Sequence, residues 1–143
     1  MEQITGNPFV NTPLKTLQVE VGSQHFFVRD NILYEKDSGN TPKCAVSYAI
    51  SVSDGTVSIL PETSSIGINA FAYAKNLTSI NFPETLTNIG SHAFYQSGLQ
   101  NLDIPGNVKK IGPWAFANCH FFKEVNIPDN CRNAGKRGIP FLP

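Results

Sequence analysis

The side chains best suited to chemistry in this sequence are its histidines and cysteines, and their spacing does not form a reaction centre. Nucleophilic catalysis needs a nucleophile, a base beside it and a group that orients the base. His25, His92 and His120 fall at unrelated positions along the chain. Cys119 and His120 are the one adjacent thiol and imidazole, but side chains of adjacent residues tend to point in different directions. The sequence therefore predicts that the protein is not an enzyme.

Metal and cofactor sites have no better support in the cysteine pattern. Cys44, Cys119 and Cys131 are odd in number, and none belongs to a C-x-x-C pair. This pattern argues against both a disulfide scaffold and a zinc site. The aspartates in predicted turns do not have the spacing of a calcium-binding loop. We therefore expect no metal and no cofactor.

Composition narrows the class of protein further. The chain has 143 residues, of which 41% are hydrophobic, and its eleven basic and eleven acidic residues cancel. A neutral chain lacks the positive field of a nucleic-acid-binding protein, and no apolar run approaches the ~20 residues that cross a bilayer. The opening residues lack the basic start and apolar stretch of a secretory signal, which leaves open a cytosolic protein or a mature form. We expect no nucleic-acid partner and no membrane insertion.

The elements that organise the chain are internal repeats. Ile-Gly-x-x-Ala-Phe occurs at residues 66–71, 89–94 and 111–116, at spacings of 23 and 22 residues. A strand-like pattern ending in proline follows the first copy, as Leu77-x-x-Ile80-x-Phe82-Pro83, and the other copies repeat it. The Ala-Phe segment predicts a short helical piece, with Pro113 suited to a first helical position. Repeats of this length predict a solenoid, since one unit cannot bury its apolar face alone.

The repeat alignment also predicts the core. Phe71, Phe94 and Phe116 occupy one position of three successive units and are expected to form an aromatic column. Cys119 aligns with the small residues Ala74 and Ser97, so we expect it to be packed in the core.

The two ends of the chain are less regular. Residues 1–51 are predicted to form an N-terminal capping section, with a strand at 14–19, a β-hairpin across 26–34 and another strand over 45–52. Residues 52–143 hold the repeats, and the last unit is degenerate from Cys131 onward. That last unit is interpreted as either a worn cap or a truncation.

The unit L-x-x-I-x-I-P-x-x-V-x-x-I-G-x-x-A-F-x-x-C, clearest from Leu99 to Cys119, resembles the BspA-like leucine-rich repeat. The likeness covers residues 52–139 closely and 4–51 loosely. It implies an α/β fold, namely a short leucine-rich-repeat solenoid with an N-terminal hairpin section. Members of this family are bacterial and protozoan surface proteins implicated in adhesion. The resemblance therefore implies an extracellular or cell-surface location and a host, matrix or cell-surface protein, or a glycan, as partner.

The candidate partner-binding residues are polar positions that point out of the predicted strands. They form two columns, Ser58, Asn81, Asp103 and Asn126 in one and Ser79, Asn101 and Glu124 in the other. One interpretation is the solvated face of a one-sided sheet. The other is a binding face, because repeat proteins present such sheets to partners.

Three aromatic residues are secondary candidates because sister repeats have polar residues at their positions. They are Tyr73, Trp114 and Phe121. Exposed aromatic side chains are favoured binding anchors. The alternative is that Trp114 and Phe121 cover the degenerate last unit together with Phe141 and Leu142.

These observations leave two hypotheses about function. The first is a non-enzymatic protein-interaction module that binds a protein or glycan through its strand-lined face. The alternative is a structural spacer of a longer repeat array, whose partners are its own neighbouring repeats.

Overall fold

The computed structural model describes residues 6–52, 55–129 and 131. Within this part of the chain every regular element is a β-strand. The strands are β1 (Phe26–Arg29), β2 (Ile32–Lys36), β3 (Pro42–Tyr48), β4 (Thr56–Ser58), β5 (Ser65–Ile66), β6 (Ser79–Asn81), β7 (Asn88–Ile89), β8 (Asn101–Asp103), β9 (Lys110–Ile111) and β10 (Glu124–Asn126).

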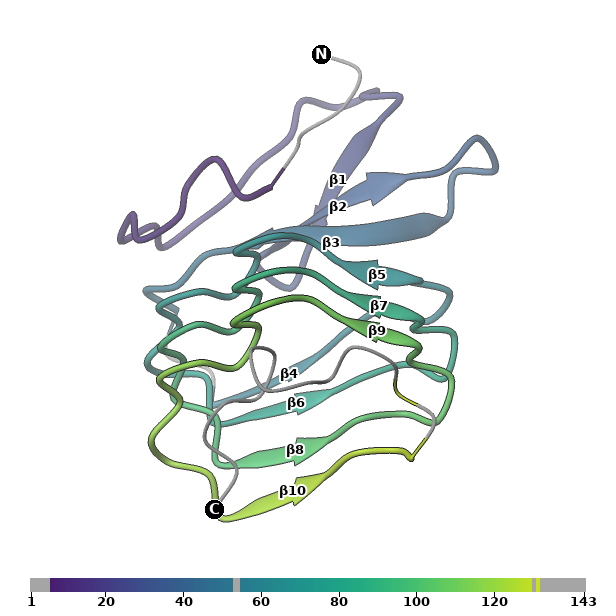
Figure 1. Ribbon diagram of the computed structural model, residues 1–143. Helices are drawn as coiled ribbons and strands as arrows, with labels where there is room; N and C mark the ends of the chain where they lie inside the picture. The colour runs from purple at the N-terminus through teal and green to yellow at the C-terminus, as the bar shows by residue number, and fades with distance from the viewer. Residues whose placement is uncertain (1–5, 53–54, 130, 132–143) are drawn as a thin grey trace.

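The chain winds into a solenoid with two short strands in each turn (Figure 1). The three-residue strands β4, β6, β8 and β10 form one wall, in which β4 pairs in parallel with β6 and β8 with β10. Between these pairs β6 lies beside β8, and the Gln100 amide donates to the Thr78 carbonyl at 2.8 Å. The two-residue strands β5, β7 and β9 pair in parallel in the other wall. The solenoid predicted from the repeats is confirmed.

The N-terminal hairpin extends the second wall. Strands β1, β2 and β3 are antiparallel, and β3 joins β5 in parallel, so all six strands form one sheet. The two turn residues Asp30 and Asn31 have φ angles of 51° and 63°, the left-handed conformation that a two-residue hairpin turn requires. This confirms the predicted hairpin.

Two expectations for the N-terminal section need correction. The strand expected over 45–52 is β3, which begins at Pro42 and ends at Tyr48. The strand expected over 14–19 is absent. Leu14, Leu17 and Val19 are half-buried there, but a single bond from the Ser51 amide to the Leu14 carbonyl takes the place of a ladder. Apolar alternation alone was therefore not sufficient for a strand.

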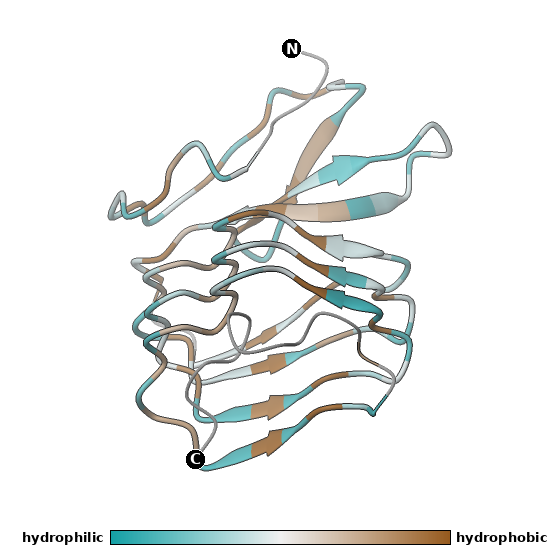
Figure 2. Ribbon diagram, viewed as in Figure 1, coloured by the Kyte–Doolittle hydropathy of each residue, from teal (hydrophilic) through white to brown (hydrophobic). Residues whose placement is uncertain are grey.

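The core lies between the two walls. The hydropathy colouring shows an apolar centre between polar ends in β6, β8 and β10 (Figure 2). The rings of Phe71, Phe94 and Phe116 stack with successive centroids 5.1 Å apart, and Tyr48 continues the column 5.3 Å from Phe71. This confirms the predicted aromatic column.

The predicted helical piece, and with it the α/β class, is wrong for the described residues. Three turn segments, residues 67–78, 90–100 and 112–123, occupy its place. In the first two segments alternate amides bond to the next solenoid turn, as Phe71 N does to Ala93 O at 2.7 Å. The intervening amides close local turns, as Ala72 N does to Asn69 O at 3.2 Å. These bonds leave no run of amides for the i−4 bonding of an α-helix.

The glycines of the second and third Ile-Gly pairs allow neighbouring turns to approach closely. A Cβ on Gly90 would lie 2.8 Å from the Gly67 carbonyl carbon and the Ile68 nitrogen, and one on Gly112 would lie 2.5 Å from the Ser91 nitrogen. Real Cβ atoms do not come that near to backbone atoms. Gly90 and Gly112 are therefore packing requirements of the stack, whereas a Cβ on Gly67 would come no nearer than 3.3 Å to the Ala45 carbonyl oxygen.

Candidate functional site

The seven strand candidates lie together on the wall formed by β4, β6, β8 and β10. Its polar rows follow the strand register, which pairs Ser58 with Asn81 and Asp103 with Asn126. The same register adds Thr56, which pairs with Ser79 and was not among the predicted residues. We call this surface the strand face; it consists of Thr56, Ser58, Ser79, Asn81, Asn101, Asp103, Glu124 and Asn126.

The strand face is exposed, polar and nearly flat. All its side chains are exposed except Ser79, which is half-buried. Asn81 Nδ2 donates to Ser58 Oγ at 3.0 Å, and Asp103 and Glu124 are its two charged residues. The depression beside Asn81 and Asp103 measures about 140 Å³, below the range of about 300–1,000 Å³ in which small-molecule sites fall. A flat surface of this kind suits a macromolecular partner.

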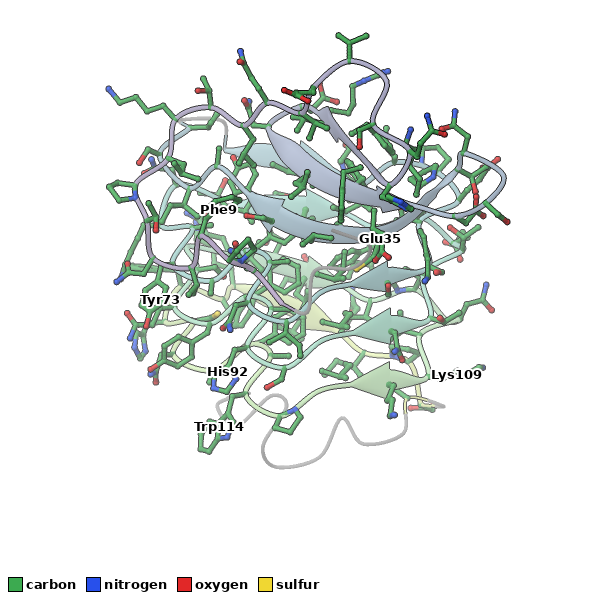
Figure 3. All side chains as sticks on the ribbon, turned by 90° about the horizontal axis from the view of Figure 1, so that it is seen from above. Phe9, Glu35, Tyr73, His92, Lys109 and Trp114 are labelled. Atoms are coloured by element: carbon green, nitrogen blue, oxygen red, sulfur yellow. The ribbon has the colours of Figure 1, made fainter. Side chains whose placement is uncertain are left out.

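A second surface lies on the turn segments, where the structure brings together two of the three aromatic candidates. Tyr73 and Trp114 line a groove of about 550 Å³, with Val10 of the N-terminal section at its edge. We call it the aromatic groove; its residues are Asn69, Tyr73, His92, Tyr95, Trp114 and Asn118. Figure 3 shows Tyr73, His92 and Trp114 along one edge of the molecule, across from Lys109.

Tyr95 is at the centre of the contacts in the aromatic groove. The Tyr73 ring meets it edge-on at 5.6 Å and the His92 ring does so at 5.5 Å. Its hydroxyl accepts hydrogen bonds from Asn118 Nδ2 at 3.1 Å and Gln96 Nε2 at 3.3 Å. The sequence alignment treated His92 only as a polar counterpart of Trp114 at the same repeat position, and it did not single out Tyr95.

The third aromatic candidate, Phe121, does not line this groove, although Asn118 borders both the groove and the depression that Phe121 lines. Its side chain is 61% exposed and lines a different depression with Lys75 and His120. The predicted capping role for Trp114 and Phe121 involves Phe141 and Leu142, which are outside the described residues.

The cysteines show no sign of an activated thiol. Cys119 is buried, its Sγ lies 3.0 Å from the Phe94 carbonyl oxygen and 3.3 Å from Ser97 Oγ, and burial raises the pKa of its thiol. A reactive thiol requires the opposite shift. This confirms the predicted core position of Cys119. In the part of the chain that the structure describes, no three His, Cys, Asp or Glu residues are grouped to hold a metal ion.

A parallel solenoid of two-strand turns with one aromatic column defines a repeat protein of the leucine-rich type. The model of the BspA type leucine-rich repeat region matches residues 48–138 with six copies. The chain belongs to this family.

Solved structures with a similar fold come from bacterial proteins. A leucine-rich repeat protein from Eubacterium ventriosum superposes with a TM-score of 0.75 at 24% identity, over 85% of this chain and 32% of that one. The pneumococcal vaccine antigen PcpA gives 0.61 at 27% identity, over 82% of this chain and 34% of that one. The chain thus spans about a third of the length of each. Comparison with curated proteins gave no match.

We find no helix in the described residues with the length and apolar character to cross a membrane.

Proposed function

We propose that this chain is a non-enzymatic, adhesion-type interaction module that binds a protein partner through its strand face. The observation that carries the proposal is the registered array of exposed polar side chains on four neighbouring strands. Repeat proteins use such repeated, ordered surfaces to hold partners. Its acidic residues, Asp103 and Glu124, favour a partner surface rich in hydrogen-bond donors or basic side chains.

The flatness of the strand face supports a protein over a small molecule. Side-chain contacts such as Asn81 to Ser58 hold part of the array in place before a partner arrives, which lowers the entropy lost on binding. Membership in a family of bacterial leucine-rich repeats, and the likeness to a vaccine antigen, support a location at the cell surface or outside the cell.

The second candidate function is a spacer within a longer repeat array. The observation favouring it is that the chain spans about a third of each similar structure. In that role the strand face would be solvated and the partners would be further repeats.

Binding to immobilised purified matrix and cell-surface proteins, measured by biolayer interferometry, separates these functions. We expect saturable binding to at least one of these proteins, weakened tenfold or more, about 1.4 kcal/mol, by the triple change Asn81→Ala, Asp103→Ala and Asn126→Ala. The matched control is Asn88→Ala with Lys110→Ala, which alters exposed positions of the opposite wall.

The control variant should bind as the unmodified chain does, and all variants should keep its melting temperature. Equal affinity of the triple variant and the unmodified chain would contradict the choice of face. Absence of any saturable binding would favour the spacer function.

A further inference from the structure

The aromatic groove is a second candidate site, on a different surface from the strand face. We infer that it binds a neutral saccharide, with a sugar ring against Trp114. This inference is independent of the proposed function, since it uses none of the strand-face residues. The backbone conformation of the aromatic residues, the charge of the groove and its open hydrogen-bonding groups all favour such a ligand.

The backbone makes the aromatic residues of the groove a costly choice for folding alone. Each turn segment has two positions with positive φ, and Trp114 at 61° and Tyr73 at 65° occupy such positions. For a bulky residue the left-handed conformation costs about 1–3 kcal/mol. Asparagine tolerates it best, and Asn69 and Asn118 stand at the positions equivalent to Trp114 and Tyr73, two turns away in each case.

Burial does not fully offset this cost at Trp114. Its side chain remains 42% exposed, so much of the indole faces solvent. An exposed aromatic ring held by a strained backbone is an arrangement found where ligands are clamped. The arrangement indicates a binding role for the indole face.

The charge of the groove selects the class of ligand. Among the residues that the structure describes, its lining contains no lysine, arginine, aspartate or glutamate. A nucleic acid would need basic side chains for its phosphates, and a charged ligand would lose hydration without gaining an ion pair. The groove therefore suits a neutral ligand.

The polar groups of the groove suit the hydroxyls of a sugar. Within the described part of the chain the Trp114 indole N–H, the side-chain amide of Asn69 and the Tyr73 hydroxyl have no hydrogen-bond partner. Amides and hydroxyls both donate and accept, as sugar hydroxyls do. The C–H face of a pyranose can lie on an indole while its hydroxyls reach such groups at the ring edge.

The size of the groove fits an oligosaccharide. Its volume of about 550 Å³ lies within the range of about 300–1,000 Å³ of small-molecule sites. It is lined from three successive solenoid turns, by Asn69, His92 and Trp114 at one repeat position. Parallel strands advance ~4.8 Å per turn, so the lining extends far enough for more than one ring.

The test uses Trp114 as its own reporter, because it is the one tryptophan of the chain. The full chain is titrated with chitotriose, maltotriose, cellotriose and lactose at concentrations up to millimolar. Tryptophan fluorescence and saturation-transfer NMR follow the binding. We expect a saturable change in emission with at least one of these sugars.

Matched variants locate the site. Trp114→Asn and Tyr73→Asn install the residues of equivalent turns and should each lower affinity tenfold or more while keeping the melting temperature. Sugar binding by Trp114→Asn is measured by NMR alone, because this variant has no tryptophan to report by fluorescence. Phe121→Asn removes an exposed aromatic outside the groove and should bind as the unmodified chain does.

Three outcomes would overturn the inference. One is that none of the four sugars binds saturably, whether or not a proline-rich peptide binds. Another is an equal loss of affinity in Phe121→Asn and Trp114→Asn. The third is a shift of tryptophan emission in Phe141→Ala with Leu142→Ala, without sugar, because it would make the chain's own C-terminal segment the occupant.

Discussion

The rings of Phe94 and Phe116 stack face to face, with centroids 5.1 Å apart and planes within 1° of parallel. The two residues stand at one position of successive repeats. Neighbouring parallel strands lie ~4.8 Å apart, so equivalent side chains are brought to the 4.5–7 Å separation at which aromatic pairs attract. The repeat period thereby sets the spacing of the aromatic column.

The first prediction concerns the centre of this column. Phe94 is fully buried and contacts Phe71, Phe82 and Phe116. Phe94→Ala should lower the free energy of unfolding by about 3–5 kcal/mol, because it removes apolar burial and leaves a cavity. Urea denaturation followed by circular dichroism measures the loss. Phe94→Leu is the control and should lose less; a loss below about 1 kcal/mol in Phe94→Ala would contradict the prediction.

The second prediction concerns the close approach of turns at Gly90. Gly90→Ala places a methyl group 2.8 Å from backbone atoms of Gly67 and Ile68. Since backbone atoms can give way only by separating the turns, we expect a loss of about 1–3 kcal/mol, measured by thermal and urea denaturation.

Gly106→Ala provides the control for that experiment, because a Cβ on Gly106 meets open space. Its stability should stay within about 0.5 kcal/mol of the unmodified chain. Equal stability of the two alanine variants would show that the turns are less tightly apposed than the structure indicates.

The third prediction concerns the buried thiol of Cys119. Burial raises its pKa above the ordinary 9.0, so the thiol's contribution to stability is fully present below about pH 9. It is lost as the pH rises, because the unfolded chain then releases a proton that the folded chain retains. The free energy of unfolding should therefore fall more steeply above pH 9 than in Cys119→Ser, which carries the Ser97 residue of the preceding turn.

Thiol modification tests the same site kinetically. In the Cys44→Ser, Cys131→Ser background, dithionitrobenzoate should react with folded Cys119 about a hundredfold or more slowly than with the denatured chain, because reaction waits for local opening. Rapid reaction in the folded state would overturn the core assignment.

Sequence alone predicted those parts of the structure that depend on repetition or on local turn chemistry. The spacing of Phe71, Phe94 and Phe116 was sufficient to place them in one column. Asp30 and Asn31 between two apolar runs were sufficient to predict the hairpin. The aromatic column depends on one position that recurs in successive repeats. The hairpin depends on a turn of four consecutive residues.

The errors lie where distant backbone groups decide the outcome. The Ala-Phe segment resembles a helical turn locally, but the Phe71 amide bonds to the Ala93 carbonyl in the next solenoid turn. The aromatic groove was missed for a related reason, since Tyr73 and Trp114 occupy different repeat positions on different turns. A repeat alignment compares equivalent positions, whereas this groove is lined by residues at non-equivalent positions of successive turns.

The last prediction concerns Tyr34, which links the N-terminal hairpin to the first solenoid turn. Its ring stacks on Phe27 with centroids 5.2 Å apart, and its hydroxyl accepts a hydrogen bond from the Leu60 amide at 3.2 Å. Tyr34→Phe leaves that amide without this partner and should lower the free energy of unfolding by about 1–3 kcal/mol at neutral pH. Urea denaturation measures the change.

The pH dependence of the same variant separates the hydroxyl from simple packing. Burial raises the pKa of Tyr34 to about 12 from 10.0. The neutral phenol therefore contributes its full stability below pH 10 and loses it as the pH rises toward 12, because only the unfolded chain ionises freely in that interval. In Tyr34→Phe the fall in stability over this interval should be smaller than in the unmodified chain. An identical fall in Tyr34→Phe and the unmodified chain would mean that the Tyr34 hydroxyl is hydrated in the folded state.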